Sequence, residues 1–325
     1  MITPEFKSNL AKYISGLIAQ KRALGHKYES QTKIFIHFDL FCAEQFPDEH
    51  TVTKPMIDVW ALKKVHEHPG TLRGRVTPVS HLAQYMCNLG HEAYVFPTNS
   101  LPDEKKYIPH IYTEDELQRL FRQIDCCHYS PEVPYRHLIM PVLFRILYCC
   151  GLRLGEALRL KSDDVNIDDG VLLIRESKYD NDRYVPMSNE LSAYCREYAE
   201  QVHQPTPHEY FFPAPDEGMI PGINIYTNFR RFLHKAGISH GGKGKGPRIY
   251  DFRHTFAVHC LKKFVLDGSD MRHYQQILKT YMGHSFFKYT AYYLRLTKDM
   301  YPDIRKKIDD CFGDMIPCLG GDSVE

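Results

Sequence analysis

The stretch Tyr250-Asp251-Phe252-Arg253-His254-Thr255-Phe256 opens a predicted helix in the second half of this 325-residue chain. Apolar residues continue from it at helical spacing, at Phe252, Phe256, Cys260, Leu261 and Phe264. An acid such as Asp251 at the first position suits the positive end of the helix dipole, which gives it a structural role. Arg253 is therefore fixed on a helix, where its guanidinium can hold a phosphate through two parallel hydrogen bonds.

Upstream of this helix, residues 1–95 predict a small all-helical domain, because apolar residues recur there at 3.6-residue spacing in four segments. The predicted helix starts are Thr3-Pro4, a position near Ser30, Thr53, and Thr77-Pro78. The expected core positions are Phe6, Leu10, Ile14, Leu17, Ile18, Ile34, Phe38, Phe41, Cys42, Met56, Ile57, Trp60, Ala61, Val79, Leu82, Met86 and Leu89. Three prolines interrupt residues 96–112, which predict an extended linker between domains.

Residues 113–325 predict a second domain that is mainly α with a small antiparallel β-sheet. Its start is marked by Thr113-x-x-Glu116, the pattern of a capping box. Short strands are expected between Val165 and Pro186, with turns at Asp169-Gly170 and at residues 179–182.

Three further motifs in this domain carry residues that suit phosphate chemistry. They are Cys150-Gly151-Leu152-Arg153 with Glu156, Ser177-Lys178 with residues 183–186, and Met282-Gly283-His284-Ser285 followed by Tyr293. Breaking a phosphodiester without a metal needs a nucleophile, cations that hold the non-bridging oxygens, and an acid for the leaving hydroxyl. These motifs supply each of the three.

Taken with the stretch at residues 250–256, these motifs resemble the tyrosine recombinase family, which includes lambda integrase, Cre and the Xer proteins. The resemblance implies a two-domain DNA clamp with a helical core-binding domain and a catalytic domain. It implies that Tyr293 attacks DNA to form a 3′-phosphotyrosine, and that recombination passes through a Holliday junction. The implied catalytic residues are Tyr293 as nucleophile, Arg153, Lys178, Tyr250, Arg253 and His284.

One position departs from the family pattern. The family usually has a histidine three residues before the second arginine, and this chain has Tyr250 there. A phenol donates a hydrogen bond but is a weaker base than imidazole at neutral pH. The group that takes the proton from Tyr293 is therefore left open.

Each motif also has an ordinary structural reading. Arg153 suits a surface position, Lys178 a solvated turn, His284 a helix cap and Tyr293 a place in an aromatic core. Tyr292 is an alternative nucleophile, although the nine-residue spacing from His284 selects Tyr293 by the resemblance. The order and spacing of four motifs together favour the recombinase.

The formal net charge of +1 hides an uneven distribution. Residues 299–325 hold seven acidic and three basic residues, a net charge of −4, so the rest of the chain carries +5. Lys243, Lys245 and Arg248 form a basic glycine-rich segment before the second arginine motif and are predicted to contact the DNA backbone. Apolar residues in the tail, 302–325, are compatible with docking onto a neighbouring protomer or onto its own domain.

No metal or nucleotide cofactor is expected; Cys126-Cys127-His128 resembles at most half of a metal site. The chain lacks an apolar run of membrane-spanning length and a secretory signal, which predicts a cytoplasmic, nucleoid-associated protein. The resemblance implies two partners: double-stranded DNA with specific recombination sites, and three further copies of the chain that form a tetramer on the DNA. Without DNA the chain is possible as a monomer.

Two other functions remain as alternatives to the recombinase, a type IB topoisomerase and a non-catalytic DNA-binding regulator. Among recombinases, a mobile-element integrase is favoured over a housekeeping enzyme.

Overall fold

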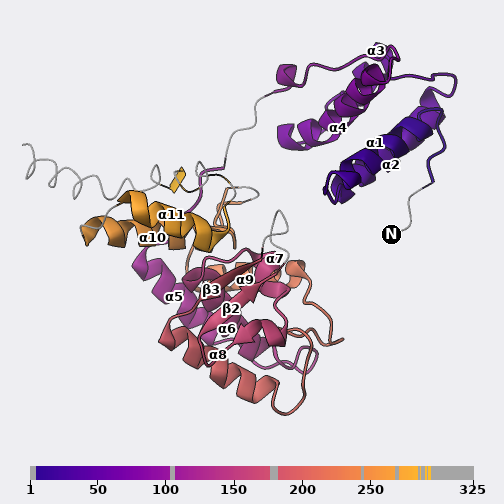
Figure 1. The fold of residues 1–325 in the computed structure, drawn as a ribbon. Helices are drawn as coiled ribbons and strands as arrows, with labels where there is room; N and C mark the ends of the chain where they lie inside the picture. Colours follow the sequence, from indigo (N-terminus) through magenta and orange to yellow (C-terminus); the bar gives the residue numbers. More distant parts are fainter. Residues whose placement is uncertain are drawn as a thin grey trace, which may run out of the picture. The chain divides into compact units, whose positions relative to one another are not determined.

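The computed structural model describes residues 5–102, 107–175, 182–242, 245–267, 271–284, 286, 290, 292 and 293. The chain divides into two compact units, Met1–Lys106 and Tyr107–Glu325, called unit 1 and unit 2 below (Figure 1). Lys178, Lys243 and the tail 302–325, for which the sequence makes predictions, lie outside the described residues.

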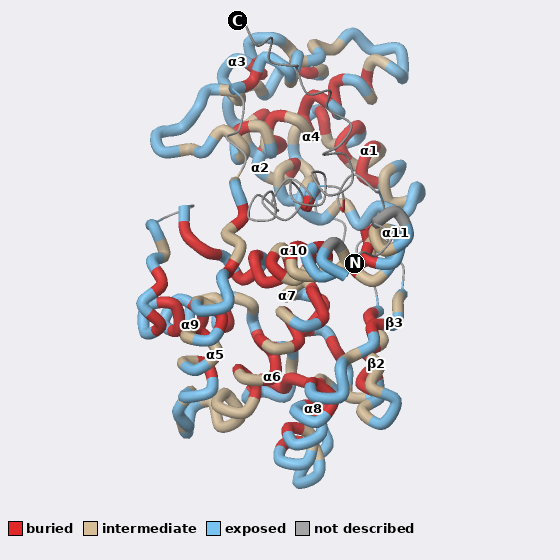
Figure 2. The backbone as a smooth tube through the Cα atoms, turned by 90° about the vertical axis from the view of Figure 1, so that its left-hand side faces the viewer, coloured by how far each residue is buried: buried red, intermediate tan, exposed pale blue. Residues whose placement is uncertain are grey.

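Unit 1 contains the four predicted helices: α1 (Ala11–Ala23), α2 (Glu29–Gln45), α3 (Lys54–Trp60) and α4 (Pro69–Asn88). Their apolar faces form one core, and the burial colours of Figure 2 follow these faces. Core residues that the sequence predicts and the structure buries are Leu10, Ile14, Leu17, Ile18, Phe38, Cys42, Met56, Ile57, Val79, Leu82 and Met86. Leu89 was expected in this core but is 52 % exposed, because the helix ends at Asn88.

Two predicted helix starts in unit 1 are wrong. The first helix begins at Ala11 rather than at Thr3-Pro4; those two residues lie outside the described part of the chain, but residues 5–10 are not helical. The backbone N–H groups of Lys7 and Ser8 bond to the carboxylate of Asp39 on α2 instead. The fourth helix begins at Pro69, and Pro78 lies inside it. Pro78 lacks one helical hydrogen bond, but the apolar face that includes the buried residues Leu72 and Val76 extends before it, so core packing outweighs the break.

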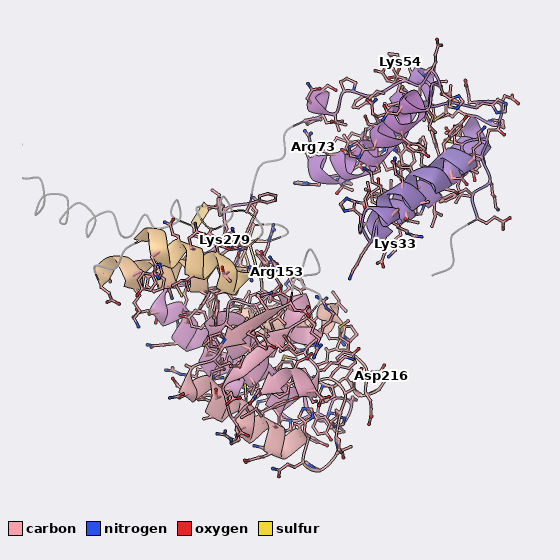
Figure 3. All side chains as sticks on the ribbon, viewed as in Figure 1. Lys33, Lys54, Arg73, Arg153, Asp216 and Lys279 are labelled. Carbon is pink, nitrogen blue, oxygen red and sulfur yellow. The ribbon has the colours of Figure 1, made fainter. Side chains whose placement is uncertain are left out.

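The predicted linker, residues 96–112, is divided between the two units. Its first part is held to α4 of unit 1 by the Arg73 guanidinium (labelled in Figure 3), which donates to the carbonyls of Thr98 and Leu101 at 2.9 and 3.0 Å. Its last part belongs to unit 2, where Tyr112 is 1 % exposed and its ring stacks on Phe252.

Unit 2 is mainly helical, as predicted. Thr113 and Glu116 form the predicted capping box at the start of the first helix. Its helices are α5 (Glu114–Asp125), α6 (Arg136–Cys149), α7 (Leu154–Leu158), α8 (Asn189–Val202), α9 (Gly222–Lys235), α10 (Asp251–Leu266) and α11 (Met271–Met282). Helix α10 packs against α6 and α11, which brings residues 100 positions apart into one core (Figure 1).

A three-stranded antiparallel sheet of order β1-β2-β3 completes unit 2, which confirms the predicted fold class. The strands are β1 (Val165–Asn166), β2 (Val171–Ile174) and β3 (Arg183–Pro186). Leu172 pairs with Val185 and Ile174 with Arg183. The buried face of β2 fixes this register, and the register places Arg183 within reach of Glu156 on α7.

Candidate active site

The first arginine motif lies in the sharp turn between α6 and α7. Gly151 has φ = 58°, and a Cβ there would come within 2.4 Å of the Phe256 ring on α10, so only glycine fits. The turn places Arg153 at the N-terminus of α7, where Figure 3 labels it. Its side chain is 24 % exposed and so can reach a ligand.

Glu156 is a buried acid that holds two arginines of the site. Its carboxylate accepts hydrogen bonds from Arg153 Nη1 at 2.5 Å and from Arg183 Nη2 at 2.9 Å. Burial alone would raise the pKa of Glu156, but the hydrogen bonds and charges of Arg183 and Arg153 lower this pKa to about 2. Glu156 is therefore ionised at neutral pH and orients Arg153.

Arg253 lies on the first turn of α10 and is fully buried. Its Nη1 donates to the Gly151 carbonyl at 2.6 Å and its Nη2 to the Met282 carbonyl at 2.5 Å. Burial and the nearby charge of Arg153 lower the pKa of Arg253. One guanidinium thus ties the first arginine motif to the Gly-His motif.

His284 follows the end of α11, at a turn made by Gly283 with φ = 65°. Its Nδ1 lies 2.9 Å from the buried Thr290 hydroxyl. Burial and the charges of Arg253, Arg153 and Arg183 lower the pKa of His284 to about 3. His284 is therefore neutral at pH 7.

Tyr293 is 2 % exposed, and its ring stacks on His284 with 6.0 Å between ring centroids. Burial raises the pKa of Tyr293 to about 12, although a hydrogen bond and the charge of Arg253 act in the opposite direction. The alternative nucleophile, Tyr292, is 36 % exposed. Of the two phenols, Tyr293 is the one directed at Arg253.

Tyr250, which stands where the family usually has histidine, is 43 % exposed at the edge of this cluster. Hydrogen bonding and charge from Tyr250 contribute to the raised pKa of Arg153 against the effect of burial, so the phenol lies beside that guanidinium. The structure therefore gathers five of the six predicted catalytic residues. The sixth, Lys178, lies outside the described residues.

His254 is a neighbour of Tyr293 that the sequence did not single out. Its ring makes edge contacts with both Tyr250 and Tyr293, at centroid distances of 4.9 and 5.4 Å. Burial and Arg253 lower the pKa of His254 to about 4. Its position directly after Arg253 in the helix was the available signal.

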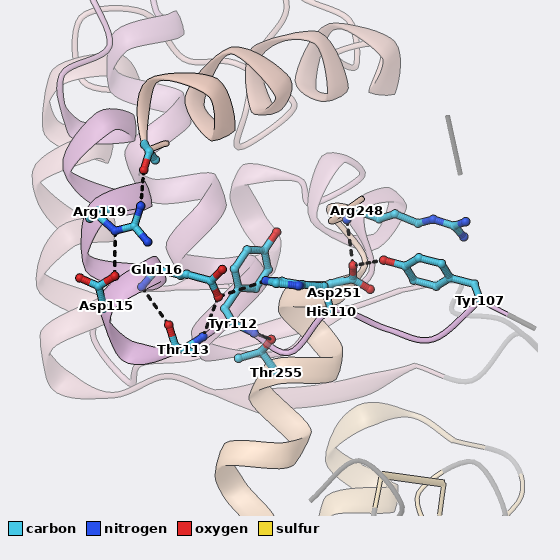
Figure 4. Close-up of polar contacts among 11 residues, drawn as sticks. Tyr107, His110, Tyr112, Thr113, Asp115, Glu116, Arg119, Arg248, Asp251 and Thr255 are labelled. Atoms are coloured by element: carbon cyan, nitrogen blue, oxygen red, sulfur yellow. Dashed lines mark hydrogen bonds and ion pairs between the residues drawn. The ribbon is translucent and has the colours of Figure 1, made fainter. Parts of the chain in front are cut away.

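The second arginine motif is anchored to the beginning of unit 2 (Figure 4). The Tyr107 hydroxyl donates to Asp251 Oδ2 at 2.5 Å and the Arg248 backbone N–H donates to the same oxygen at 2.8 Å. The Arg248 guanidinium carbon lies 3.6 Å from the centroid of the Tyr107 ring. Two predicted DNA contacts, Lys245 and Arg248, are exposed here, and Lys243 is not among the described residues.

Within the part of the chain that the structure describes, no three His, Cys, Asp or Glu residues are grouped as metal ligands would be. This includes Cys126-Cys127-His128. Among the same residues, no helix is long and apolar enough to cross a membrane.

Comparisons with known proteins agree with the family that these site residues indicate. A family model described as the phage integrase family matches residues 111–300, more than half of the chain. The integrase/recombinase y4rB of Sinorhizobium fredii is 26 % identical over 314 residues, which cover 93 % of this chain and 98 % of that protein.

Two solved structures share the fold. One is the XerH site-specific recombinase bound to palindromic difH substrate in a post-cleavage complex, with a TM-score of 0.63, 16 % identity and coverage of 94 % of this chain and 90 % of that one. The other is a lambda integrase tetramer bound to a Holliday junction, with a TM-score of 0.63, 14 % identity and coverage of 88 % and 76 %. The chain belongs to the phage integrase family, the tyrosine recombinases.

Because His254 and His284 are neutral in the folded protein, we expect acid to lower its free energy of unfolding. Each has a pKa below the ordinary value of 6.5, so the unfolded chain binds their protons first as the pH falls. Their stabilising contribution is complete above about pH 6.5 and is lost toward pH 4, with a slope of up to about 1.4 kcal/mol per pH unit for each histidine. Urea unfolding between pH 7 and 4.5 should show a shallower slope in His254→Gln than in the unmodified chain. Equal slopes in the two proteins would show that His254 is not held neutral.

Proposed function

We propose that this protein cuts and rejoins double-stranded DNA at specific sites through a 3′-phosphotyrosine at Tyr293. The observation that carries this proposal is the convergence of Tyr293, Arg253, Arg153 and His284, which come from three separate motifs. A buried phenol beside two guanidinium groups, with no metal required, matches the needs of phosphoryl transfer to an oxygen nucleophile.

In this mechanism the Tyr293 hydroxyl gives up its proton to solvent as its oxygen attacks the scissile phosphorus, and the bond from phosphorus to the 5′ oxygen breaks. Arg153 and Arg253 hold the non-bridging oxygens as negative charge develops, and neutral His284 donates a hydrogen bond to them. Lys178 gives a proton to the leaving 5′ oxygen. A 5′ hydroxyl of the partner strand then gives its proton to Lys178 and attacks the phosphotyrosine, which restores the phosphodiester. Tyr293 leaves and takes a proton from solvent.

The surroundings of the site are assigned on the same basis. Residues 1–95 act as the core-binding domain, 96–112 as the linker and 113–325 as the catalytic domain, and Lys243, Lys245 and Arg248 contact the DNA backbone. Because structural neighbours are complexes with a difH substrate and with a Holliday junction, we propose a tetramer on DNA and a Holliday-junction intermediate. The apolar residues of the acidic tail 302–325 suit docking onto a neighbouring protomer. The corresponding biological role is that of a mobile-element integrase, which would be cytoplasmic and associated with the nucleoid. Its affinity for DNA should fall steeply as the salt concentration rises.

Two other functions use the same residues. A type IB topoisomerase would relax supercoiled DNA without joining two sites, and a non-catalytic regulator would bind DNA without cutting it. The test is incubation with two copies of the DNA that flanks the gene. Junctions between the two copies support the recombinase, whereas relaxation without junctions supports a topoisomerase and binding alone supports a regulator.

Replacing Tyr250 with histidine tests the departure from the family pattern. We expect Tyr250→His to cleave DNA at the original rate or up to about tenfold faster, because imidazole is the better proton acceptor at neutral pH. The measurement is the rate of covalent adduct formation at saturating DNA, with Tyr250→Phe as the matched variant that lacks the hydroxyl. If Tyr250→His loses cleavage, the phenol has a role that imidazole cannot fill.

A further inference from the structure

Tyr107 is the first residue of unit 2; it makes two contacts with the segment that precedes the second arginine motif and one with Asp251 inside that motif. Its hydroxyl donates to Asp251 Oδ2 at 2.5 Å and also lies 3.1 Å from the Gly246 carbonyl oxygen. Its ring lies under the exposed Arg248 guanidinium at 3.6 Å (Figure 4). Tyr107 therefore touches the glycine-rich basic segment and the start of α10 together, across more than 130 positions of sequence.

Asp251 transmits these contacts to the reacting groups. Its Oδ2 accepts from the Arg248 N–H, and its own N–H donates to the Arg248 carbonyl at 2.9 Å, which closes the turn 248–251. Tyr250 lies within this turn, and the Arg253 N–H donates to the Tyr250 carbonyl at 3.1 Å. The placement of Tyr250 and Arg253 therefore depends on the turn 248–251. Asp251 closes this turn through its hydrogen bonds to Arg248, and Tyr107 stabilises it by bonding to the Asp251 carboxylate.

The surroundings of Asp251 make the Tyr107 hydrogen bond important. The carboxylate is fully buried, and among the described residues its Oδ1 has no hydrogen-bond partner. Burial raises the pKa of Asp251, while hydrogen bonds from Tyr107 and the Arg248 backbone, with a further one involving His110, lower it. The titratable or charged groups that face Asp251 are thus Tyr107, His110, Arg248 and the buried phenol of Tyr112. Loss of the Tyr107 hydroxyl would leave a poorly compensated buried carboxylate.

We propose that Tyr107 is a positioning residue that joins the segment arriving from unit 1 to the second arginine motif. Through Asp251 it fixes the turn that places Tyr250 and Arg253, and through its ring it aims Arg248 at the DNA backbone. This inference rests on the proposed DNA cleavage. It gives the first residue of unit 2 a direct influence on the site, since a displacement of Tyr107 would release both the turn and the Arg248 guanidinium.

Two substitutions distinguish the contribution of the Tyr107 hydroxyl from that of its ring. Tyr107→Phe keeps the ring under Arg248 and removes the hydrogen bonds, whereas Tyr107→Leu removes both. The matched control is Tyr112→Phe, which deletes the hydroxyl of another tyrosine in the same segment. This hydroxyl is buried and has no hydrogen-bond partner among the described residues. Cleavage is measured on a pool of nicked duplexes of randomised sequence, as the rate of forming detergent-resistant adducts with saturating full-length protein. Binding is measured on a mixed-sequence duplex as a function of salt.

For Tyr107→Phe we expect cleavage to fall about ten- to a hundredfold with unchanged DNA affinity and salt slope, because a charge-assisted bond is lost while the ring stays. The acid limb of its pH–rate profile should move to higher pH, since Asp251 loses a hydrogen bond that lowers its pKa. Tyr107→Leu should also lose about 0.9 from the slope of log K against log salt, the value of one phosphate contact. Tyr112→Phe should match the unmodified chain in every measurement.

If Tyr107→Phe cleaves DNA at the original rate and with the original pH–rate profile, Tyr107 is not a positioning residue. If Tyr107→Leu keeps the original salt dependence of DNA binding, the ring does not orient Arg248. A fall in cleavage matched by an equal fall in Tyr112→Phe would show a general packing defect instead. If the unmodified protein forms no adduct with the pool, the proposed function is wrong, and the inference about Tyr107 is wrong as well because it rests on that function. That outcome is distinct from a failure of Tyr107 alone.

Discussion

Arg253→Lys should lower the rate of DNA cleavage by about 100- to 1000-fold, the cost of removing one preorganised donor from a transition-state site. The buried Arg253 guanidinium bonds the carbonyls of Gly151 and Met282 at once. A lysine ammonium is a single compact charge and cannot reproduce that planar fork. The variant therefore keeps a cation but loses the link between the first arginine motif and the Gly-His motif. Single-turnover adduct formation at saturating DNA measures the effect.

The matched control for this experiment is Arg119→Lys. Arg119 pairs with Asp115 one turn away on α5, with 39 % and 75 % of the two side chains exposed, and its Nη1 donates to the Ala236 carbonyl at the end of α9 (Figure 4). Lysine can keep such a pair, so cleavage should be unchanged. A rate for Arg253→Lys within about threefold of the unmodified protein would remove Arg253 from the catalytic set.

Glu156→Ala should destabilise the protein by about 3–5 kcal/mol, because it leaves the buried Arg183 guanidinium without its acidic partner. The Arg183 side chain is 9 % exposed and makes two hydrogen bonds to Glu156, at 2.9 and 3.3 Å. Glu156→Gln keeps the shape and one acceptor oxygen, so its loss should be smaller. Urea unfolding at pH 7 measures the free energy of each variant.

A partly exposed ion pair provides the comparison for this loss. Asp125 bonds to Arg145 at 2.6 Å, but 44 % of the Asp125 side chain is exposed. Asp125→Ala should therefore cost no more than about 1 kcal/mol. Similar costs for Glu156→Ala and Asp125→Ala would mean that the Glu156 cluster is solvated rather than buried.

Local signals predicted much of the fold. Thr113 and Glu116 form their capping box because both partners lie within one helical turn. The strands around Asp169-Gly170 follow from alternation and turn chemistry, which are also local. The starts at Thr3-Pro4 and Thr77-Pro78 are wrong because distant residues decide them. Asp39 takes the N–H groups before α1, and core packing carries α4 through Pro78.

The same distinction applies to the site. Arg153, Arg253, His284 and Tyr293 belong to motifs whose spacing is visible in the sequence, and the structure gathers them with Tyr250. The partners that hold them were missed, because their contacts span long sequence distances. Arg183 reaches Glu156 across 27 positions and Tyr107 reaches Asp251 across 144. Neither residue type is unusual where it stands, so only the folded chain shows its role.

Covalent trapping on a nicked duplex tests the role of Tyr293 most directly. The duplex comes from the DNA that flanks the gene, and its nick lets the leaving strand diffuse away so that religation is prevented. We expect one detergent-resistant adduct, which proteolysis assigns to Tyr293 joined to a 3′ phosphate, and which Tyr293→Phe abolishes while Tyr292→Phe retains it. An adduct that persists in Tyr293→Phe, or that is lost only in Tyr292→Phe, would show that another residue is the nucleophile.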